Sequence, residues 1–408
     1  MKTENSMDET LVSQSQMKAV KKDVVIVGGG MVGAAAAIGL AQLGLNVAVI
    51  EAYAPKPYSS EQAIDIRVSA VSLASEQLLE RLGALKSLSL MRRAAYLGLE
   101  TWERDGFITR FHAEQVGVPH LGHIVENRLI QLALWEQFDS FDNIELFCPA
   151  KVECFSRREQ GVTVTLDTGV SLDTKLLVGA DGANSQVRTW AGIGLTGWDY
   201  AQSAMLINIK TDCPQQDVTW QQFTPQGPRS LLPLPGNNAS LVWYDDASRI
   251  AQLSQLSNTA LEQQIKAHFP ERLDRQFEVL QKGSFKLTRR HAQSYFTDNL
   301  VILGDAAHTI NPLAGQGGNI GFKDVDALVS TVSEKINQGE PWWEEPTLRS
   351  YQKSRYKDNQ LMMSAMDLFY AGFSNELLPL KILRNAALKV ANIDSPVKKY
   401  VLKYALGL

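Results

Sequence analysis

The stretch that decides the fold runs from Asp23 to Glu51 and reads DVVIVGGGMVGAAAAIGLAQLGLNVAVIE. Its apolar start, Val24 to Val27, is typical of a buried parallel strand, and the alanine-rich segment after it is typical of a helix. Between the two, Gly28, Gly30 and Gly33 form the pattern G-x-G-x-x-G. The stretch therefore predicts a strand, a tight turn, a helix and a second strand, which together are the Rossmann-type unit.

Each glycine of this pattern has a physical task in dinucleotide binding. Gly28 permits the tight turn, Gly30 lets a pyrophosphate approach the backbone, and Gly33 lets the helix pack on the strand. The helix N-terminus offers free N–H groups and the positive end of its dipole to the phosphates. Glu51 follows 21 positions after Gly30, where its carboxylate can accept hydrogen bonds from a ribose hydroxyl. The alternative is a glycine-rich turn without a ligand, but the complete unit favours a dinucleotide.

The bulk composition is that of an ordinary soluble chain. Its 408 residues are 45% hydrophobic and 21% charged, which suffices for one large or two medium domains. The net charge of −4 provides no basic field that would attract nucleic acid. Residues 1–20 are polar and lack the apolar core of a signal peptide, so we expect a flexible tail there. No apolar run is long enough to span a membrane, and we therefore expect a cytoplasmic protein.

The cysteines limit the redox chemistry of the chain itself. Cys148, Cys154 and Cys213 form neither a C-x-x-C pair nor a metal-binding spacing, which favours a reducing compartment without a disulfide framework. The chain also lacks a second G-x-G-x-x-G, and this argues against disulfide reductases with two dinucleotide domains. Any redox chemistry must therefore come from a bound cofactor.

Two further stretches place a turn directly after a buried strand. Residues 176–188 read LLVGADGANSQVR and contain Asp181 and Gly182, whereas residues 299–321 read NLVILGDAAHTINPLAGQGGNIG. Open α/β sheets bind ligands at the carboxyl ends of their strands, so both turns are candidate binding elements. Any Asp-Gly pair can also be a simple turn. In the later stretch, His308 is either a general base or a residue that structures the loop.

The rest of the chain alternates between helical and strand patterns. Arg67 lies among small residues and can either pair with a phosphate or remain on the surface. Apolar spacing predicts helices near residues 75–82, 126–134 and 258–268. Strands are expected within residues 95–111 and at 144–147, 151–157, 162–166, 204–209, 218–223, 229–233, 240–244 and 283–287. The strand-rich texture of residues 200–290 predicts an antiparallel sheet domain inserted into the α/β framework.

The last part of the chain is helical and differs in texture. Met362, Met363 and Met366 lie at helical spacing, so they belong either to the core or to an apolar substrate channel. Residues 377–408 carry six basic side chains and one acidic side chain among leucines and valines. This pattern is typical either of a basic amphipathic helix on an anionic membrane or of a docking helix with a solvated cationic face.

Taken in order, the three motifs resemble those of the class A flavoprotein aromatic hydroxylases built like para-hydroxybenzoate hydroxylase. Residues 304–317, residues 366–375 and the ending at residues 402–408 are similar to the ubiquinone-biosynthesis hydroxylases of that class. The resemblance implies an α/β fold with a Rossmann-like FAD-binding domain, an inserted antiparallel β-sheet substrate domain and C-terminal helices. The FAD-binding domain would comprise residues 21–88, 122–195 and 290–360, the substrate domain residues 89–121 and 196–289, and the helices residues 361–408.

The same resemblance implies a role for each motif residue. The residues that would bind FAD are Gly28, Gly30, Gly33, Glu51, Arg67, Arg128, Asp181, Gly182, Gly304, Asp305, Gly318 and Asn319. The residues that would lie against the reacting isoalloxazine ring are Pro312, Gly315, Gln316 and Gly317. Asp181 and Gly182 would also contact NAD(P)H. Gly318 departs from the family pattern, which often has a bulkier apolar residue there, and no metal is implied.

The implied chemistry is that of the cofactor. FAD would be reduced by NAD(P)H as electron donor and would react with O2 to a C4a-hydroperoxide. This species would hydroxylate a polyprenylated quinol precursor of ubiquinone, at the stage of demethoxyubiquinol. A membrane surface on the inner face and a ubiquinone-biosynthesis enzyme complex would be partners, without nucleic acid. The alternatives are a sister hydroxylase of another ring position, a flavin-dependent prenyl reductase on the same fold, and a structural subunit with vestigial FAD.

Overall fold

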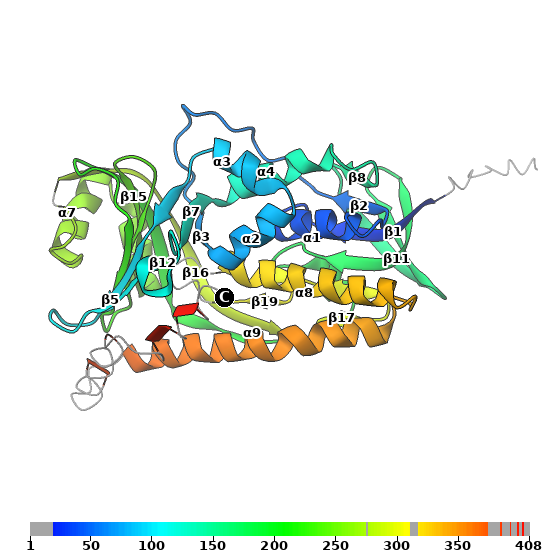
Figure 1. Ribbon diagram of the computed structural model, residues 1–408. Coiled ribbons are helices and arrows are strands. Elements are labelled where there is room, and N and C mark those ends of the chain that lie inside the picture. Colours follow the sequence, from blue (N-terminus) through cyan, green and yellow to red (C-terminus); the bar gives the residue numbers. More distant parts are fainter. Residues whose placement is uncertain are drawn as a thin grey trace, which may run out of the picture.

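The computed structural model describes residues 19–274, 276–310 and 317–373, together with 384–385, 392, 398–399 and 402–403. Within these residues the chain forms two eight-stranded sheets and a three-stranded sheet, with helices packed around them (Figure 1). This arrangement confirms the predicted α/β class with a second, mainly antiparallel sheet. The proposed domain boundaries remain a proposal, which the membership of the strands in the sheets supports.

The first sheet is built around the opening stretch of the sequence. Its main path runs β17-β18-β11-β1-β2-β8, and β10 and β9 are added at β11. The five parallel strands are β1 (Val20–Val27), β2 (Val47–Ile50), β8 (Ile144–Phe147), β11 (Ser171–Gly179) and β18 (Leu300–Ile302). The antiparallel additions are β9 (Val152–Arg158), β10 (Gly161–Leu166) and β17 (Phe296–Thr297). Residues 24–26 of the central strand are fully buried, which explains their unbroken apolar run.

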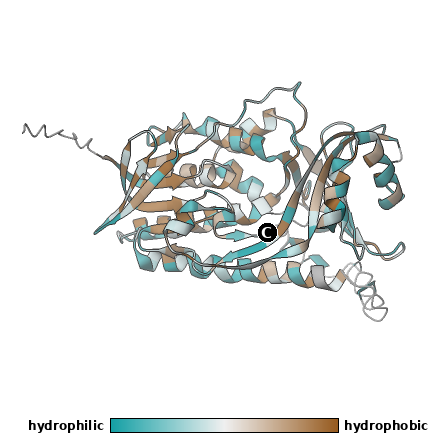
Figure 2. Ribbon diagram, turned by 180° about the vertical axis from the view of Figure 1, so that it is seen from behind, coloured by the Kyte–Doolittle hydropathy of each residue, from teal (hydrophilic) through white to brown (hydrophobic). Residues whose placement is uncertain are grey.

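Helices packed against this sheet, or against the helix α1 that covers it, complete the first core. They are α1 (Met31–Ala41), α4 (Asn127–Phe138), α8 (Gly317–Asn337) and α9 (Glu345–Phe373). The four consecutive alanines at 34–37 are fully buried, and Gly39 approaches Val329 of α8 so closely that an added Cβ would lie 2.7 Å from its side chain. Small residues on α1 therefore let it lie close to both its sheet and α8. Figure 2 shows the apolar colouring concentrated in these central strands and in α1.

The second sheet carries the long strands of the middle of the chain. Its order is β19-β16-β12-β15-β14-β13-β5-β6. The bounds are β5 (Gly98–Trp102), β6 (Thr109–His112), β12 (Leu195–Thr211), β13 (Val218–Gln222), β14 (Arg229–Pro233), β15 (Asn238–Asp246), β16 (Phe277–Ala292) and β19 (His308–Thr309). Helices α6 (Ala247–Gln255) and α7 (Asn258–His268) cover one face, where Met205, Trp220 and Trp243 form a separate core. Only the β5–β13 pair is parallel among the described pairs of this sheet.

A small sheet lies between these two bodies. It consists of β3 (Val68–Ser72), β7 (Gly122–Glu126) and β4 (Ala94–Tyr96), in the order β3-β7-β4. The adjoining helices are α2 (Leu73–Arg81) and α3 (Ala84–Leu90), and short helices follow elsewhere at α5 (Gln186–Trp190), η1 (Ala113–Val116) and η2 (Gly304–Ala306). The edge strand β3 is completed by the side chain of Asn319, which accepts from Ser72 N–H (3.0 Å) and donates to the carbonyl of Ala70 (2.8 Å). This side chain fastens α8 to the small sheet.

Helix α9 joins the two bodies, because it runs along the base of the first sheet and reaches the second (Figure 1). Asp367 accepts a hydrogen bond from the Tyr200 hydroxyl of β12 and lies 2.8 Å from Nε of Arg289 on β16. Met363 is buried against Ile310 and Ile320, which places it in the core, whereas Leu368 is exposed. No helix among the described residues is long and apolar enough to cross a membrane.

The basic side chains of residues 377–408 are not all exposed to solvent. Of its six basic residues, Arg384 and Lys398 are buried. Arg384 forms an ion pair with Glu103 after β5, with Nε 2.8 Å from a carboxylate oxygen, and Lys398 donates to the carbonyl of Asn392 at 3.1 Å. These two side chains therefore serve packing inside the molecule. Lys399 and Lys403 are exposed, and most of residues 377–408 lie outside the described residues.

Candidate active site

The three sequence motifs meet at one edge of the first sheet. The parallel neighbours β18, β11, β1 and β2 lie side by side in that order. Their carboxyl ends are followed by Gly304, Asp181, Gly28 and Glu51, respectively. Because parallel strands end at the same edge, residues more than 250 positions apart in sequence form one surface at the place where open α/β sheets bind ligands.

The glycine turn has the geometry that its sequence predicts. Gly28 has φ +101°, and a Cβ there would lie 2.4 Å from the carbonyl oxygen of Ala180. At Gly33 a Cβ would lie 1.8 Å from the carbonyl oxygen of Gly28, so helix and strand touch at this point. Gly30 is different, since a Cβ would meet nothing within 4 Å. It is the N-cap of α1 and makes no side-chain capping bond, which leaves the first-turn N–H groups available for an anionic ligand.

Glu51 is held firmly beside this turn. Its carboxylate accepts hydrogen bonds from the backbone N–H of Gly29 (2.7 Å) and of Tyr53 (3.1 Å). Each oxygen accepts one of these bonds and keeps a lone pair for a ligand hydroxyl. The carbonyl of Gly29 accepts from Gln131 Nε2 (2.9 Å) and Trp135 Nε1 (2.7 Å). The sequence does not reveal this support from α4, because nothing in the local pattern pairs the helix with the turn.

The second motif is fixed by its own aspartate. The Asp181 carboxylate accepts from the N–H groups of Gln186 (2.8 Å) and Val187 (3.1 Å) and from the Ser185 hydroxyl (2.5 Å). It thereby caps the start of α5, while Gly182 takes the left-handed φ of +81° that the turn requires. The predicted contact of both residues with FAD and NAD(P)H remains a prediction.

Arg188 connects the second motif to the third, a role that its position in the sequence does not reveal. Its side chain is buried and donates from Nη1 to the carbonyl of Ala306 (2.8 Å) and from Nη2 to the carbonyl of Ala183 (3.1 Å). Burial lowers the pKa of its guanidinium, and the nearby Asp181 opposes this effect. The buried charge is therefore used to hold two turns in register across 118 residues of sequence.

The turn of the third motif rests on a buried polar network. Asp324 of α8 accepts from the N–H of Gly304 (3.1 Å), pairs with Nε2 of His308 (2.5 Å) and accepts from Nε of Arg355 (2.9 Å). Asn359 donates to the same carboxylate (3.2 Å) and to the hydroxyl of Tyr295 (3.0 Å). His308 is 3% exposed and engaged in this network. Of its two expected roles, general base or loop-structuring residue, the structure favours the second.

Electrostatics explain how the buried Asp324 stays charged. Burial alone would raise its pKa, but the imidazole of His308 and the guanidinium of Arg355 outweigh burial and lower the pKa below its ordinary value. The left-handed Gly304, with φ +56°, is thereby held by a fixed anion beneath it. The network positions the turn that presents Asp305.

Asp305 and Arg67 are exposed charged groups that interact electrostatically beside the third motif. Asp305 is exposed, yet the surrounding protein partly desolvates its carboxyl group and raises its pKa. His308 and Arg67 act in the opposite direction. Arg67 is exposed, and in the part of the chain that the structure describes its guanidinium makes no ion pair or hydrogen bond. Both groups are therefore available to a ligand with hydroxyls and phosphates.

Arg128 and Asn319 are two further predicted site residues that have structural partners. The guanidinium of Arg128 binds Asp65 through Nε (2.8 Å) and Nη2 (3.2 Å) and donates to the carbonyl of Lys56 (2.7 Å). It fastens the loop after β2, and its predicted phosphate contact remains a prediction. The side chain of Asn319 is bound to β3 and to the hydroxyl of Ser75 (2.8 Å). A contact of Asn319 with FAD would therefore come from its backbone.

The predicted ring-facing residues are only partly described. Gly317 and Gly318 open α8, and a Cβ on Gly318 would lie 3.5 Å from Oγ of Ser69 and 3.7 Å from Cε of Met31, which is ordinary contact. Space for a side chain is therefore present at position 318, and the glycine there leaves that space empty. Pro312, Gly315 and Gln316 lie outside the described residues, so their role stays a prediction.

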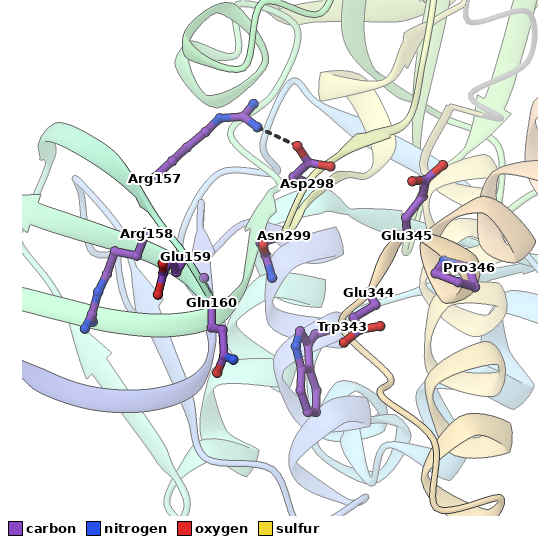
Figure 3. Close-up of a pocket in the computed structure, with 11 residues that line it drawn as sticks. Arg157, Arg158, Glu159, Gln160, Asp298, Asn299, Trp343, Glu344, Glu345 and Pro346 are labelled. Atoms are coloured by element: carbon purple, nitrogen blue, oxygen red, sulfur yellow. Dashed lines mark hydrogen bonds and ion pairs between the residues drawn. The ribbon is translucent and has the colours of Figure 1, made fainter.

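A surface cleft of about 510 Å³ lies elsewhere (Figure 3). Arg157, Asp298, Asn299 and Trp343 are among the residues that line it. Asn299 directly precedes β18, so the cleft lies at the amino end of a parallel strand, at the opposite edge from the three motifs. We therefore assign the candidate site to the carboxyl edge, where the motifs converge.

The carboxyl edge fits FAD. An uncapped helix N-terminus with open space at Gly30 suits a pyrophosphate, Glu51 and Asp305 suit hydroxyl groups, and the unpaired Arg67 suits an anion. Gly30, Glu51 and Asp305 follow the ends of three strands of the first sheet, β1, β2 and β18, and Arg67 directly precedes β3 of the small sheet. Binding groups spread over several elements suit the extended form of a dinucleotide.

The comparisons with known proteins agree with this geometry. Residues 21–365 match the family described as FAD binding domain. The chain is 47% identical over 386 residues to the 3-demethoxyubiquinol 3-hydroxylase of Escherichia coli (strain K12), covering 95% of this chain and 98% of that protein. It is 31% identical to the ubiquinone hydroxylase UbiL of Rhodospirillum rubrum, covering 94% and 89%. The solved structure of p-nitrophenol 4-monooxygenase PnpA from Pseudomonas putida DLL-E4 has the same fold, with a TM-score of 0.78 at 20% identity and coverage of 95% and 97%.

Proposed function

Because the chain belongs to the FAD-binding-domain family, we propose that it is an FAD-dependent monooxygenase that hydroxylates the ring of a demethoxyubiquinol-type polyprenylated quinol in ubiquinone biosynthesis. The observation that carries this proposal is the likeness to a demethoxyubiquinol hydroxylase along nearly the full length of both chains. The convergence of all three motifs at four neighbouring strand ends supports the use of FAD.

In this proposal the chain binds and orients its cofactor at the carboxyl edge. The first-turn N–H groups of α1 bind the pyrophosphate, Glu51 the adenosine ribose and Asp305 the ribityl chain. Backbone N–H groups at the start of α8, at Gly317 and Gly318, stabilise negative charge on the ring. When bound, FAD supplies the electron transfer from NAD(P)H and the activation of O2 for insertion into an electron-rich ring.

A sister hydroxylase that acts at another ring position is the second candidate. The chain is also 31% identical to the ubiquinone hydroxylase UbiL, which carries a different name from the demethoxyubiquinol hydroxylase. This second likeness to a hydroxylase favours the sister reaction over a prenyl reductase. Both candidates use the same FAD site and differ only in the placement of the substrate ring. The substrate must therefore be identified by chemistry in the cell and in vitro.

Quinone profiling of a strain that lacks this protein distinguishes the candidates. We expect demethoxyubiquinone to accumulate and ubiquinone to return when the gene is restored. Accumulation of an earlier phenol would instead assign the sister reaction.

The purified protein tests the reaction itself. It should be yellow, and ¹⁸O2 should label the product in the presence of NAD(P)H. Saturation of the prenyl chain without O2 uptake would refute the monooxygenase assignment.

We further propose that the protein works in the cytoplasm, at the inner face of the membrane and beside other ubiquinone-biosynthesis enzymes. Its prenylated substrate is apolar, and the molecule exposes Leu361 (64%) and Leu368 (74%), seven positions apart on α9. The exposed Lys399 and Lys403 supply positive charge. Sedimentation with anionic vesicles tests the contact: Leu361→Gln with Leu368→Gln should reduce the bound fraction, and equal binding would exclude α9 as the contact.

A further inference from the structure

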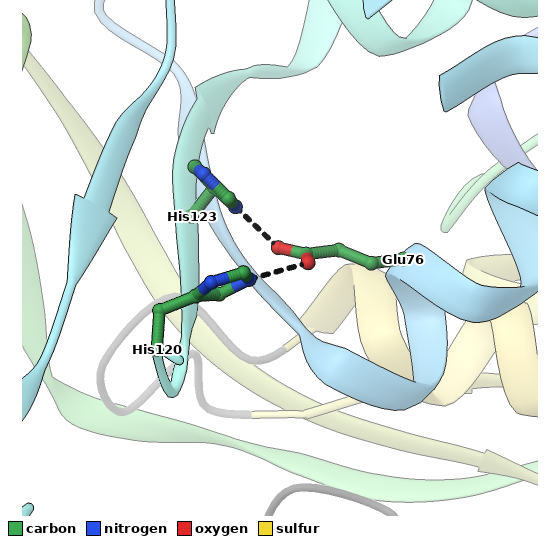
Figure 4. A group of neighbouring side chains, drawn as sticks. All are labelled: Glu76, His120 and His123. Atoms are coloured by element: carbon green, nitrogen blue, oxygen red, sulfur yellow. Dashed lines mark hydrogen bonds and ion pairs between the residues drawn. The ribbon is translucent and has the colours of Figure 1, made fainter. Parts of the chain in front are cut away.

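Two histidines and one glutamate converge outside the motifs of the candidate active site. Glu76 lies on α2, His123 on β7, and His120 in the turn before β7 (Figure 4). One carboxylate oxygen of Glu76 is 2.7 Å from Nε2 of His120, and the other is 2.5 Å from Nδ1 of His123. The three side chains are 10–20% exposed, so the group is largely removed from solvent.

The charge of this group requires a positive partner. Within the described residues, no lysine or arginine pairs with Glu76, and its ion-pair contacts are the two imidazoles. A carboxylate that is largely buried is costly unless a cation compensates it. The compensating charge is either a proton on an imidazole or a metal ion bound among the three side chains.

We propose that Glu76, His120 and His123 bind one Zn²⁺ ion. Two imidazole nitrogens and one carboxylate oxygen are a usual zinc ligand set, with water in the fourth position. The three ligand atoms lie within 4.8 Å of one another. Ligand atoms around a tetrahedral zinc ion are about 3.3 Å apart, so the ion fits after side-chain shifts of less than about 1 Å. Two nitrogens among three ligands disfavour Mg²⁺ and Ca²⁺, which prefer oxygen.

The ion would connect α2 to β7 and the turn before it. The ligands come from α2 and from residues 44 and 47 positions later in the chain. Ser75, the neighbour of Glu76, donates to Asn319 in the first turn of α8. A zinc ion at Glu76 would therefore stabilise the contact between Ser75 and Asn319, which holds the start of α8. The candidate active site uses this helix start, but the ion would not itself contact the cofactor.

Metal binding by the full-length FAD-loaded protein tests the site. After treatment with dipicolinate, titration with Zn²⁺ in a calorimeter should show one high-affinity site per chain. Glu76→Gln and His123→Gln should each weaken binding more than about 100-fold, because a direct ligand is lost. The double variant His112→Gln with Glu114→Gln is the matched control, since that exposed pair is 3.7 Å apart and should leave the affinity unchanged.

The absence of a stoichiometric zinc site would overturn the proposal and identify the group as a hydrogen-bonded clamp. Undiminished affinity in the ligand variants would overturn it equally. Flavin absorbance and thermal unfolding report whether each variant is folded. His120→Gln removes the most exposed of the three ligands and decides the question if the other two variants do not fold. Zinc binding is measured independently of hydroxylation, so this test and that of the proposed function fail separately.

Discussion

Single residues of the first turn have different tasks although they share one motif. A side chain at Gly30 would enter open space in front of α1, whereas one at Gly33 would collide with the carbonyl of Gly28. We expect Gly30→Val to fold with the thermal stability of FAD-free wild type and to lack the flavin absorbance near 450 nm. Gly33→Val should fail to fold, because helix and strand can no longer touch. Wild-type flavin content in Gly30→Val would contradict the assignment of the pyrophosphate site.

The motif glycines could be predicted from the sequence, because their tasks depend on spacing along one short segment. The tasks of Arg188 and Arg128 could not be predicted, since their partners are 118 and 63 positions away in sequence. An arginine near a turn can bind a ligand or a carbonyl with equal ease. Only the fold shows that Arg188 joins two motifs and that Arg128 binds Asp65.

Among the secondary structure elements, α8 and α9 are connected by the buried Asp324. Asp324→Asn would remove the fully buried partner of both Arg355 and His308 and leave the partly exposed Asp358 to pair with the buried Arg355. We expect a loss of about 3–5 kcal/mol in the free energy of unfolding. Asp326→Asn, two residues later, is the control, because its pair with Arg81 is exposed and should be worth less than about 1 kcal/mol. Urea denaturation of the three proteins measures both values, and equal stability of the two variants would exclude the role of the network.

The same carboxylate predicts a pH dependence. The pKa of Asp324 in the folded protein is lower than in the unfolded chain, where it is about 3.9. Its contribution to stability is therefore complete above that value and is lost as the pH falls through the folded pKa. In Asp324→Asn the free energy of unfolding should fall less steeply below pH 4 than in wild type. An unchanged acid limb would contradict a lowered pKa.

The lengths of the elements were only partly predictable. Residues 144–147, 229–233 and 258–268 form the expected strands and helix, because their local patterns are complete. Strands β12 and β16 extend far beyond residues 204–209 and 283–287, since they pair with each other along polar stretches that carry no alternation. Helix α6 was not predicted, because its amphipathic pattern is only nine residues long and the helix is set by the packing of Ile250 and Leu253 on β12, β15 and β16.

At the scale of the whole molecule, the buried pair Glu103–Arg384 joins the second sheet to the last part of the chain. Glu103→Gln should lower the free energy of unfolding by about 3–5 kcal/mol, because the buried arginine loses its ion pair. Glu345→Gln, which removes an exposed pair with Arg349, should change it by less than about 0.5 kcal/mol. Chemical denaturation measures both, and similar curves for the two variants would contradict a stabilising role for the buried pair.

The order of strands in the first sheet also bears on how the chain is assembled during synthesis. β1 and β2 leave the ribosome early, but β18 follows β2 by about 250 residues and must still be added to the same sheet beyond β11. The edge that binds the dinucleotide is therefore incomplete until residues past Gly304 have emerged. We therefore expect the early part of the chain to fold before the flavin site is complete, because that site requires β18 and the turn after it.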